Sequence, residues 1–168
     1  MTYKSGHVVP WWDKSFKNLP YEYYPIINTW DEQRWIKEGY TGVTLNGGLY
    51  AMPKPMPDYA EPFLKLFDWK NVGLGFYRMN TLEMLPVHRD HYLEYQQKFN
   101  ITDPSIIWRC IVFLEDWQSG HYMEVEGKPI VDWKCGDYVM WNYNVAHYAG
   151  NFGIEPRYTI QITGCQIK

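Results

Sequence analysis

Hydrophobic and polar positions follow different patterns in the two parts of the chain, and the change comes near Val72. Before it, helices are predicted at 31–37, capped by Thr29, and at 59–69, capped by Asp58 and carrying an apolar stripe. After it, short extended runs are separated by turn-forming Asn, Gly, Asp and Pro, which is typical of strands. The predicted strands are 72–79, 82–91, 106–114, 121–125, 138–143 and 158–166, with a short helical insertion at 92–99.

This pattern predicts a mainly β fold, a double-stranded β-helix (a cupin-like jelly roll) with a few N-terminal helices packed on its outer face. We expect one domain over residues 1–168. Residues 1–70 would form an aromatic-rich helical or irregular part, and residues 71–168 the jelly-roll core. The 9 Trp, 15 Tyr and 7 Phe favour a sheet-rich core.

Charge and cysteine content exclude several classes of protein. The formal net charge of -3 gives no broad basic surface, which argues against a nucleic-acid partner. The three cysteines are an odd number without CxxC spacing, which argues against a disulfide framework and favours a reducing cytoplasm. No run of residues has the length and apolarity of a signal peptide or a membrane span, so we expect a cytoplasmic protein without a membrane partner.

Candidate chemistry starts at His88 and Asp90, which lie two residues apart in a predicted strand. Alternate side chains of a strand point to the same face, so these two would lie side by side. His147 is the candidate third ligand. Two imidazoles and one carboxylate form the ligand set of non-haem Fe(II) oxygenases. Each residue by itself is also compatible with a solvated strand end or a half-buried histidine.

Two arginines are candidates for binding a carboxylate. Arg157 and Thr159 share one face of the last strand, and an arginine beside a hydroxyl is suited to charge-assisted hydrogen bonds. That polar face would point into a closed barrel or, alternatively, toward water. Arg109 interrupts an apolar strand, where it would either bind a ligand carboxylate or neutralise a buried Asp or Glu. His7 and His121 are expected at the surface, and His91 near the metal without ligating it.

From Val72 to Lys168 the chain resembles the iron(II)- and 2-oxoglutarate-dependent dioxygenase superfamily. The resemblance is carried by His88-Arg89-Asp90, Gly136-Asp137, His147 and Arg157. The run 147–151, followed by Arg157-Tyr158-Thr159, is most similar to the aspartyl/asparaginyl β-hydroxylase and prolyl-hydroxylase-like branch. Prolyl hydroxylases usually carry lysine where Arg157 stands, and aspartyl hydroxylases often lack the Asp90 carboxylate, so the substrate stays open.

The resemblance implies a role for each of these residues. His88, Asp90 and His147 would be the catalytic Fe(II) ligands. Arg157, with Thr159, would bind the distal carboxylate of 2-oxoglutarate, and Arg109 the carboxylate nearer the metal. The implied reaction uses O2, with ascorbate as reductant. It hydroxylates a C–H bond of a protein, peptide or small-molecule substrate while 2-oxoglutarate is oxidatively decarboxylated to succinate.

Two other classes compete with this hypothesis. A non-catalytic jelly-roll binding module would use the same histidines and arginine to hold a sugar or an acid. A cupin-type metalloenzyme would need the metal but not 2-oxoglutarate. Such a cupin has no need for a carboxylate-binding arginine ten residues beyond its last ligand, so Arg157 distinguishes the two enzymes.

Overall fold

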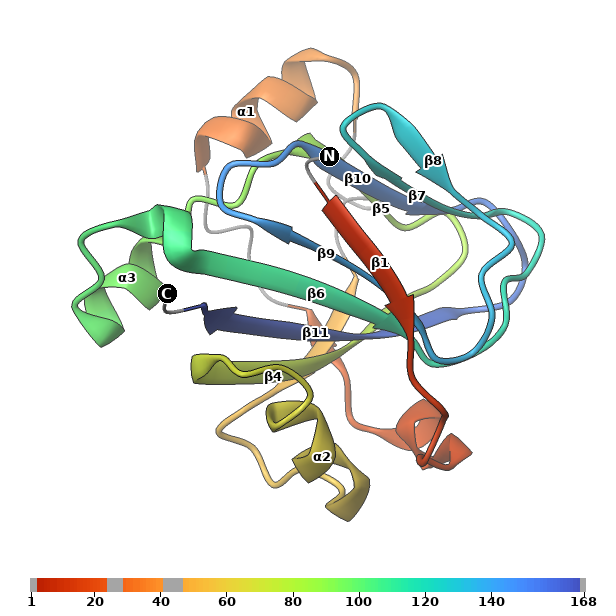
Figure 1. The fold of residues 1–168 in the computed structure, drawn as a ribbon. Coiled ribbons are helices and arrows are strands. Elements are labelled where there is room, and N and C mark those ends of the chain that lie inside the picture. The colour runs from red at the N-terminus through yellow and green to blue at the C-terminus, as the bar shows by residue number, and fades with distance from the viewer. Residues whose placement is uncertain (1–2, 24–28, 41–46, 167–168) are drawn as a thin grey trace.

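The computed structural model describes residues 3–23, 29–40 and 47–166, and its ribbon is drawn in Figure 1. The strands are β1 (Tyr3–His7), β2 (Glu22–Tyr23), β3 (Gly48–Ala51), β4 (Lys70–Met79), β5 (Met84–His88), β6 (Ile107–Phe113), β7 (His121–Val125), β8 (Lys128–Ile130), β9 (Asp137–Asn142), β10 (His147–Asn151) and β11 (Arg157–Cys165). The α-helices are α1 (Thr29–Lys37), α2 (Glu61–Leu64) and α3 (Leu93–Phe99), and the 3-10 helices are η1 (Lys14–Asn18), η2 (Asp58–Ala60) and η3 (Pro104–Ile106).

Two antiparallel sheets form the body of the fold. The larger has the order β1-β9-β6-β11-β4-β3-β2 and the smaller β5-β10-β7-β8. Figure 1 shows β1, β9, β6, β11 and β4 side by side, with β10, β7 and β8 in a second layer. The arrangement is the predicted double-stranded β-helix, with few helices.

The two faces of the large sheet are both covered, each by its own hydrophobic cluster. The outer face, which carries Phe76 and Ile160, packs against Phe16 of η1 and Phe63 of α2. Figure 1 places α2 beside β4, on the side away from the small sheet. The inner cluster joins the two sheets and consists of Ile111, Phe113, Met123, Val125, Trp133, Val139, Trp141 and Val145. Of the N-terminal part, η1 and α2 therefore pack on the outer face, whereas β1, β2 and β3 extend the large sheet.

The predicted helix 31–37 is confirmed as α1, which begins two residues earlier, at Thr29, whereas the predicted helix 59–69 is too long. Its segment forms only the short elements η2 and α2 and ends at Leu64. Beyond that point Phe67 stacks on Trp69, with ring centroids 4.6 Å apart, and Trp69 covers Gly164 of β11. Aromatic packing on the sheet overrides helix propensity in this segment.

Five strands are absent from the sequence prediction: β1, β2, β3, β8 and β10. They are two to five residues long, and β10 has no apolar alternation because its inward positions carry His147 and Asn151. The predicted strand 82–91 is also shorter. Leu82 has a left-handed backbone with φ 66°, so the strand begins only at Met84. At its other end the strand stops at His88. Within the described residues, no helix is long and apolar enough to span a membrane.

Candidate metal centre

His88, Asp90 and His147 come together at one end of the small sheet. Their ligand atoms all lie within 4.8 Å of one another. His88 ends β5 and His147 begins β10, and the two residues are directly paired across these strands. Asp90 lies just beyond β5 rather than in it, so the turn of the chain, and not strand alternation, directs its carboxylate toward the histidines.

Both imidazoles are oriented by a backbone carbonyl two residues earlier. His88 Nδ1 lies 2.7 Å from the Pro86 oxygen, and His147 Nδ1 lies 3.0 Å from the Val145 oxygen. A carbonyl only accepts hydrogen bonds, so each Nδ1 carries the hydrogen and each Nε2 keeps its lone pair. The Nε2 atoms face the Asp90 carboxylate at 3.9 and 3.7 Å. Fixing the tautomer in this way is how proteins prepare histidine to bind a metal.

The protonation states suit a cation. Burial and the neighbouring His88 lower the pKa of His147 to about 3, so its imidazole is neutral. Burial by itself would raise the pKa of Asp90, but Arg109, both histidines and a hydrogen bond from Tyr92 together bring it well below its usual range. The centre therefore offers two imidazole nitrogens and one carboxylate, which is the donor set of a 2-His-1-carboxylate iron site.

Arg157 is buried inside the fold, at 5% exposure, at the start of β11. Its Nη1 lies 3.3 Å from the Met79 sulfur, and its Nε has no hydrogen-bond partner in the described part of the chain. Burial lowers the pKa of Arg157 to about 10, against an opposing effect of Tyr77, so the guanidinium stays charged at neutral pH. No carboxylate in the described ranges forms an ion pair with it. A buried cation of this kind calls for an anionic ligand.

The sequence left open whether the polar face of the last strand points into the barrel or toward water. In the structure this face of β11 points inward. Tyr158, Ile160 and Ile162 belong to the outer cluster. Thr159 is buried on the opposite face, next to Arg157 in the alternation and paired in register with Tyr77 of β4. The alternative in which this face meets water is wrong.

Arg109 lies at the metal centre and is bonded to protein groups there. Its Nη2 is 3.4 Å from Asp90 Oδ2, and its Nη1 donates to Gln161 Oε1 at 2.6 Å. Of the two roles that the sequence allowed, this geometry favours neutralisation of an acid, the half-buried Asp90.

Several residues of the site could not be found from the sequence. Trp35 of α1 packs edge-on against the His88 ring at 5.8 Å and donates to the Val87 carbonyl at 3.4 Å. Tyr92 donates to Asp90 at 3.0 Å. The expectation for His121 is wrong, since it is 5% exposed and bonds the Glu155 carbonyl through Nε2. His91 lies next to Asp90 in the chain, but it is exposed and outside the cluster.

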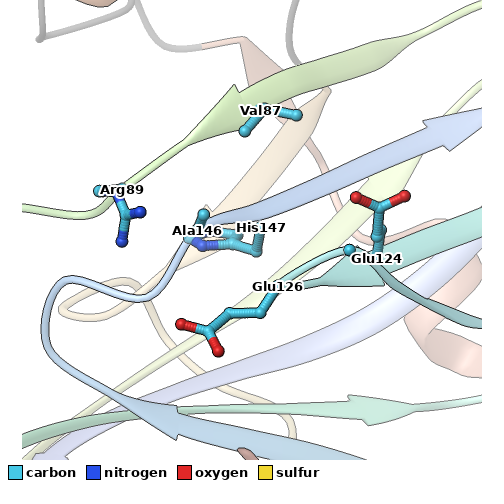
Figure 2. A pocket seen from close by; sticks show the side chains of 7 residues that line it. Val87, Arg89, Glu124, Glu126, Ala146 and His147 are labelled. Atoms are coloured by element: carbon cyan, nitrogen blue, oxygen red, sulfur yellow. The ribbon is translucent and has the colours of Figure 1, made fainter. Parts of the chain in front are cut away.

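A pocket of about 250 Å³ lies beside the centre, where β5, β10 and β7 pair (Figure 2). Its lining includes His147, with Arg89 on one side and Glu124 and Glu126 on the other. Neither His88 nor Asp90 lines it, so the pocket adjoins the cluster only through His147.

Comparison with known proteins supports the fold. The sequence matches no protein-family model and no curated protein. A prolyl-4-hydroxylase from Pseudomonas putida is similar in structure, with a TM-score of 0.63 at 11% identity, covering 99% of this chain and 94% of that one. A predicted oxalate decarboxylase from Thermotoga maritima gives 0.45 at 9% identity, covering 71% and 81%. The Schizosaccharomyces pombe Cnp3 cupin domain gives 0.46 at 11%, covering 76% and 69%.

The first of these similarities extends over almost the whole chain and identifies a double-stranded β-helix protein. The other two have TM-scores below 0.5 and add nothing to that conclusion. At these identities the comparison describes the fold, and the chemistry has to be argued from the residues of the site.

Proposed function

We propose that the protein is an Fe(II)- and 2-oxoglutarate-dependent dioxygenase, a single oxygenase domain that hydroxylates a C–H bond of a protein, peptide or small molecule. The observation that carries the proposal is Arg157, which is buried without a carboxylate partner among the described residues, in the same fold that assembles His88, Asp90 and His147. A metal site explains the three ligands. An anionic ligand would supply the charged partner for Arg157, whose guanidinium contacts the Met79 sulfur and the Trp133 ring.

In this proposal the protein residues bind, orient and shield. His88, Asp90 and His147 would hold Fe(II), which supplies the activation of O2 when bound and leaves coordination positions open. Arg157 would hold the distal carboxylate of 2-oxoglutarate, with Thr159 providing a hydroxyl on the same inward face. The stacked pair Phe113 and Trp133, with centroids 4.0 Å apart, helps to keep the interior dry.

A cupin-type metalloenzyme without 2-oxoglutarate is the second candidate, because its fold and ligand set would be the same. It gives no reason for a buried guanidinium without a carboxylate partner in the described structure, and such a charge costs stability. A non-catalytic binding module would explain Arg157 but not two histidines whose Nε2 atoms both face an ionised Asp90.

The proposal includes a cytoplasmic location, which is supported by the three free cysteines. Ascorbate is the reductant that we would supply in vitro. The chemical class of the substrate is not specified by the site residues, so the test must not depend on it.

The experiment is succinate formation from 2-oxoglutarate by the full chain with Fe(II), ascorbate and O2, without added substrate. Asp90→Ala removes the carboxylate ligand, and His91→Ala changes an exposed neighbour in the same loop. We expect succinate from the wild type and from His91→Ala, and none from Asp90→Ala. Equal succinate from all three proteins, or from none, would contradict the proposal.

A further inference from the structure

The two oxygens of the Asp90 carboxylate have different surroundings. Oδ2 accepts a hydrogen bond from the Tyr92 hydroxyl at 3.0 Å and lies 3.4 Å from Arg109 Nη2. Oδ1 lies 3.9 Å from His88 Nε2 and has no hydrogen-bond donor in the described residues. Oδ2 also lies 3.7 Å from His147 Nε2, so each oxygen faces one histidine, while Tyr92 and Arg109 both contact Oδ2.

The arginine that holds Oδ2 is itself fixed on two sides. Gln161 of β11 accepts from Arg109 Nη1 at 2.6 Å. The guanidinium carbon lies 5.3 Å from the centre of the Tyr92 ring, and Arg109 Nε approaches the Tyr92 hydroxyl at 3.4 Å. A planar guanidinium that is bonded at one edge and stacked on an aromatic ring has little freedom to turn.

Tyr92 reaches this position through an unusual backbone conformation. Its φ is 52°, in the left-handed region that an aromatic residue rarely adopts. Tyr92 immediately precedes α3, and its carbonyl accepts from the Gln96 amide at 2.8 Å. Such strain costs free energy and persists where the surrounding contacts require it, which often marks a functional position.

We propose that Tyr92 and Arg109 are positioning residues that hold the Asp90 carboxylate through Oδ2 and so keep it directed toward His88 and His147 as a metal ligand. Tyr92 thereby couples the α3 insertion to the metal centre. The inference rests on the metal site of the proposed function, but it does not depend on 2-oxoglutarate or on turnover. Outer partners of a metal ligand typically change affinity or activity by about 10- to 100-fold when removed.

The test is titration of the metal-free full chain with Co²⁺, followed by visible absorption, which reports the ligand geometry. Tyr92→Phe removes the hydroxyl but keeps the ring under Arg109. Tyr95→Phe is the matched control: Tyr95 lies in α3, and its hydroxyl bonds the Asn71 carbonyl at 2.7 Å instead of a candidate ligand. Gln161→Met is a second variant, which frees Arg109 while leaving both positioning residues in place.

We expect Tyr92→Phe to weaken Co²⁺ binding by about 10-fold and to shift the absorption bands, with Gln161→Met moving both in the same direction. Tyr95→Phe should bind and absorb like the wild type. Wild-type affinity and spectrum in both test variants would overturn the inference, as would an equal change in Tyr95→Phe. Wild type that binds no Co²⁺ would overturn the metal centre as well. Normal Co²⁺ behaviour without succinate formation would contradict only the proposed function.

Discussion

His88 and His147 face each other across the pairing of β5 with β10, and their rings lie 4.2 Å apart. Two imidazole rings at this distance gain little from each other, and neither Nε2 makes a hydrogen bond in the described structure. The pair is explained if a cation binds between these nitrogens and Asp90.

We predict that His147→Ala abolishes stoichiometric metal binding and reduces iron-dependent succinate formation by at least about 100-fold, because two ligands do not hold iron in an open site. Metal content after dialysis, together with the succinate assay, provides the measurement. His91→Ala is the control, since this histidine is exposed and outside the cluster. Turnover retained in His147→Ala would remove His147 from the centre.

Arg157→Met should stabilise the ligand-free protein while weakening 2-oxoglutarate binding. Burial lowers the arginine pKa from 12.5 to about 10, which corresponds to roughly 3 kcal/mol against the charged form. A methionine of similar length removes that charge without opening a large cavity. Urea unfolding should show a gain on the order of 1–3 kcal/mol, and the KM for 2-oxoglutarate should rise. A destabilised variant with an unchanged KM would contradict the role proposed for Arg157.

Stability should fall as the pH drops below about 6.5, in part because of His121. Burial and the nearby Arg157 lower the pKa of His121 below 6.5, so the unfolded chain takes up the proton first. Such a histidine destabilises the folded chain progressively as the pH falls from 7 toward 5. His121→Asn should reduce the slope of unfolding free energy against pH. Part of the slope should remain in this variant, because the pKa of His147 is also lowered, to about 3. A slope that does not change would show that His121 titrates normally.

Gly136 should tolerate no side chain. Its φ is 93°, and a Cβ there would lie 2.1 Å from the Val8 carbonyl oxygen. Gly127 is the matched position, with φ 74° and open space around it. Gly127→Ala should cost only the strain of a left-handed residue, about 1–2 kcal/mol, whereas Gly136→Ala should cost clearly more. Urea denaturation of both variants measures the difference, and equal costs would contradict the steric argument.

The sequence was sufficient for those parts of the fold in which apolar side chains alternate or cluster. Strands β4, β6 and β11 lie next to one another in the large sheet, and each was predicted within two residues at its start. Strand β10 was not predicted because its inward side chains include His147 and Asn151. A site built from polar residues on inward positions removes the very signal that marks a strand.

The spacing of His88, Asp90 and His147 in the sequence was enough to suggest that these three side chains gather in the fold. The surroundings of Asp90 were beyond prediction, because they depend on the φ of 52° at Tyr92 and on β11 placing Gln161 beside Arg109. Contacts of this kind depend on the register of the strands and on the left-handed backbone conformation at Tyr92. Neither can be predicted from the spacing of residues in the sequence.

The most direct test of the central claim is calorimetric titration of 2-oxoglutarate into the full chain without O2, with and without Mn²⁺, for the wild type and Arg157→Met. If the three ligands and Arg157 form one site, the wild type binds 2-oxoglutarate tightly only when the metal is present, and Arg157→Met binds it much more weakly even then. Binding that is equally tight without metal, or no binding by the metal-loaded wild type, would contradict the account.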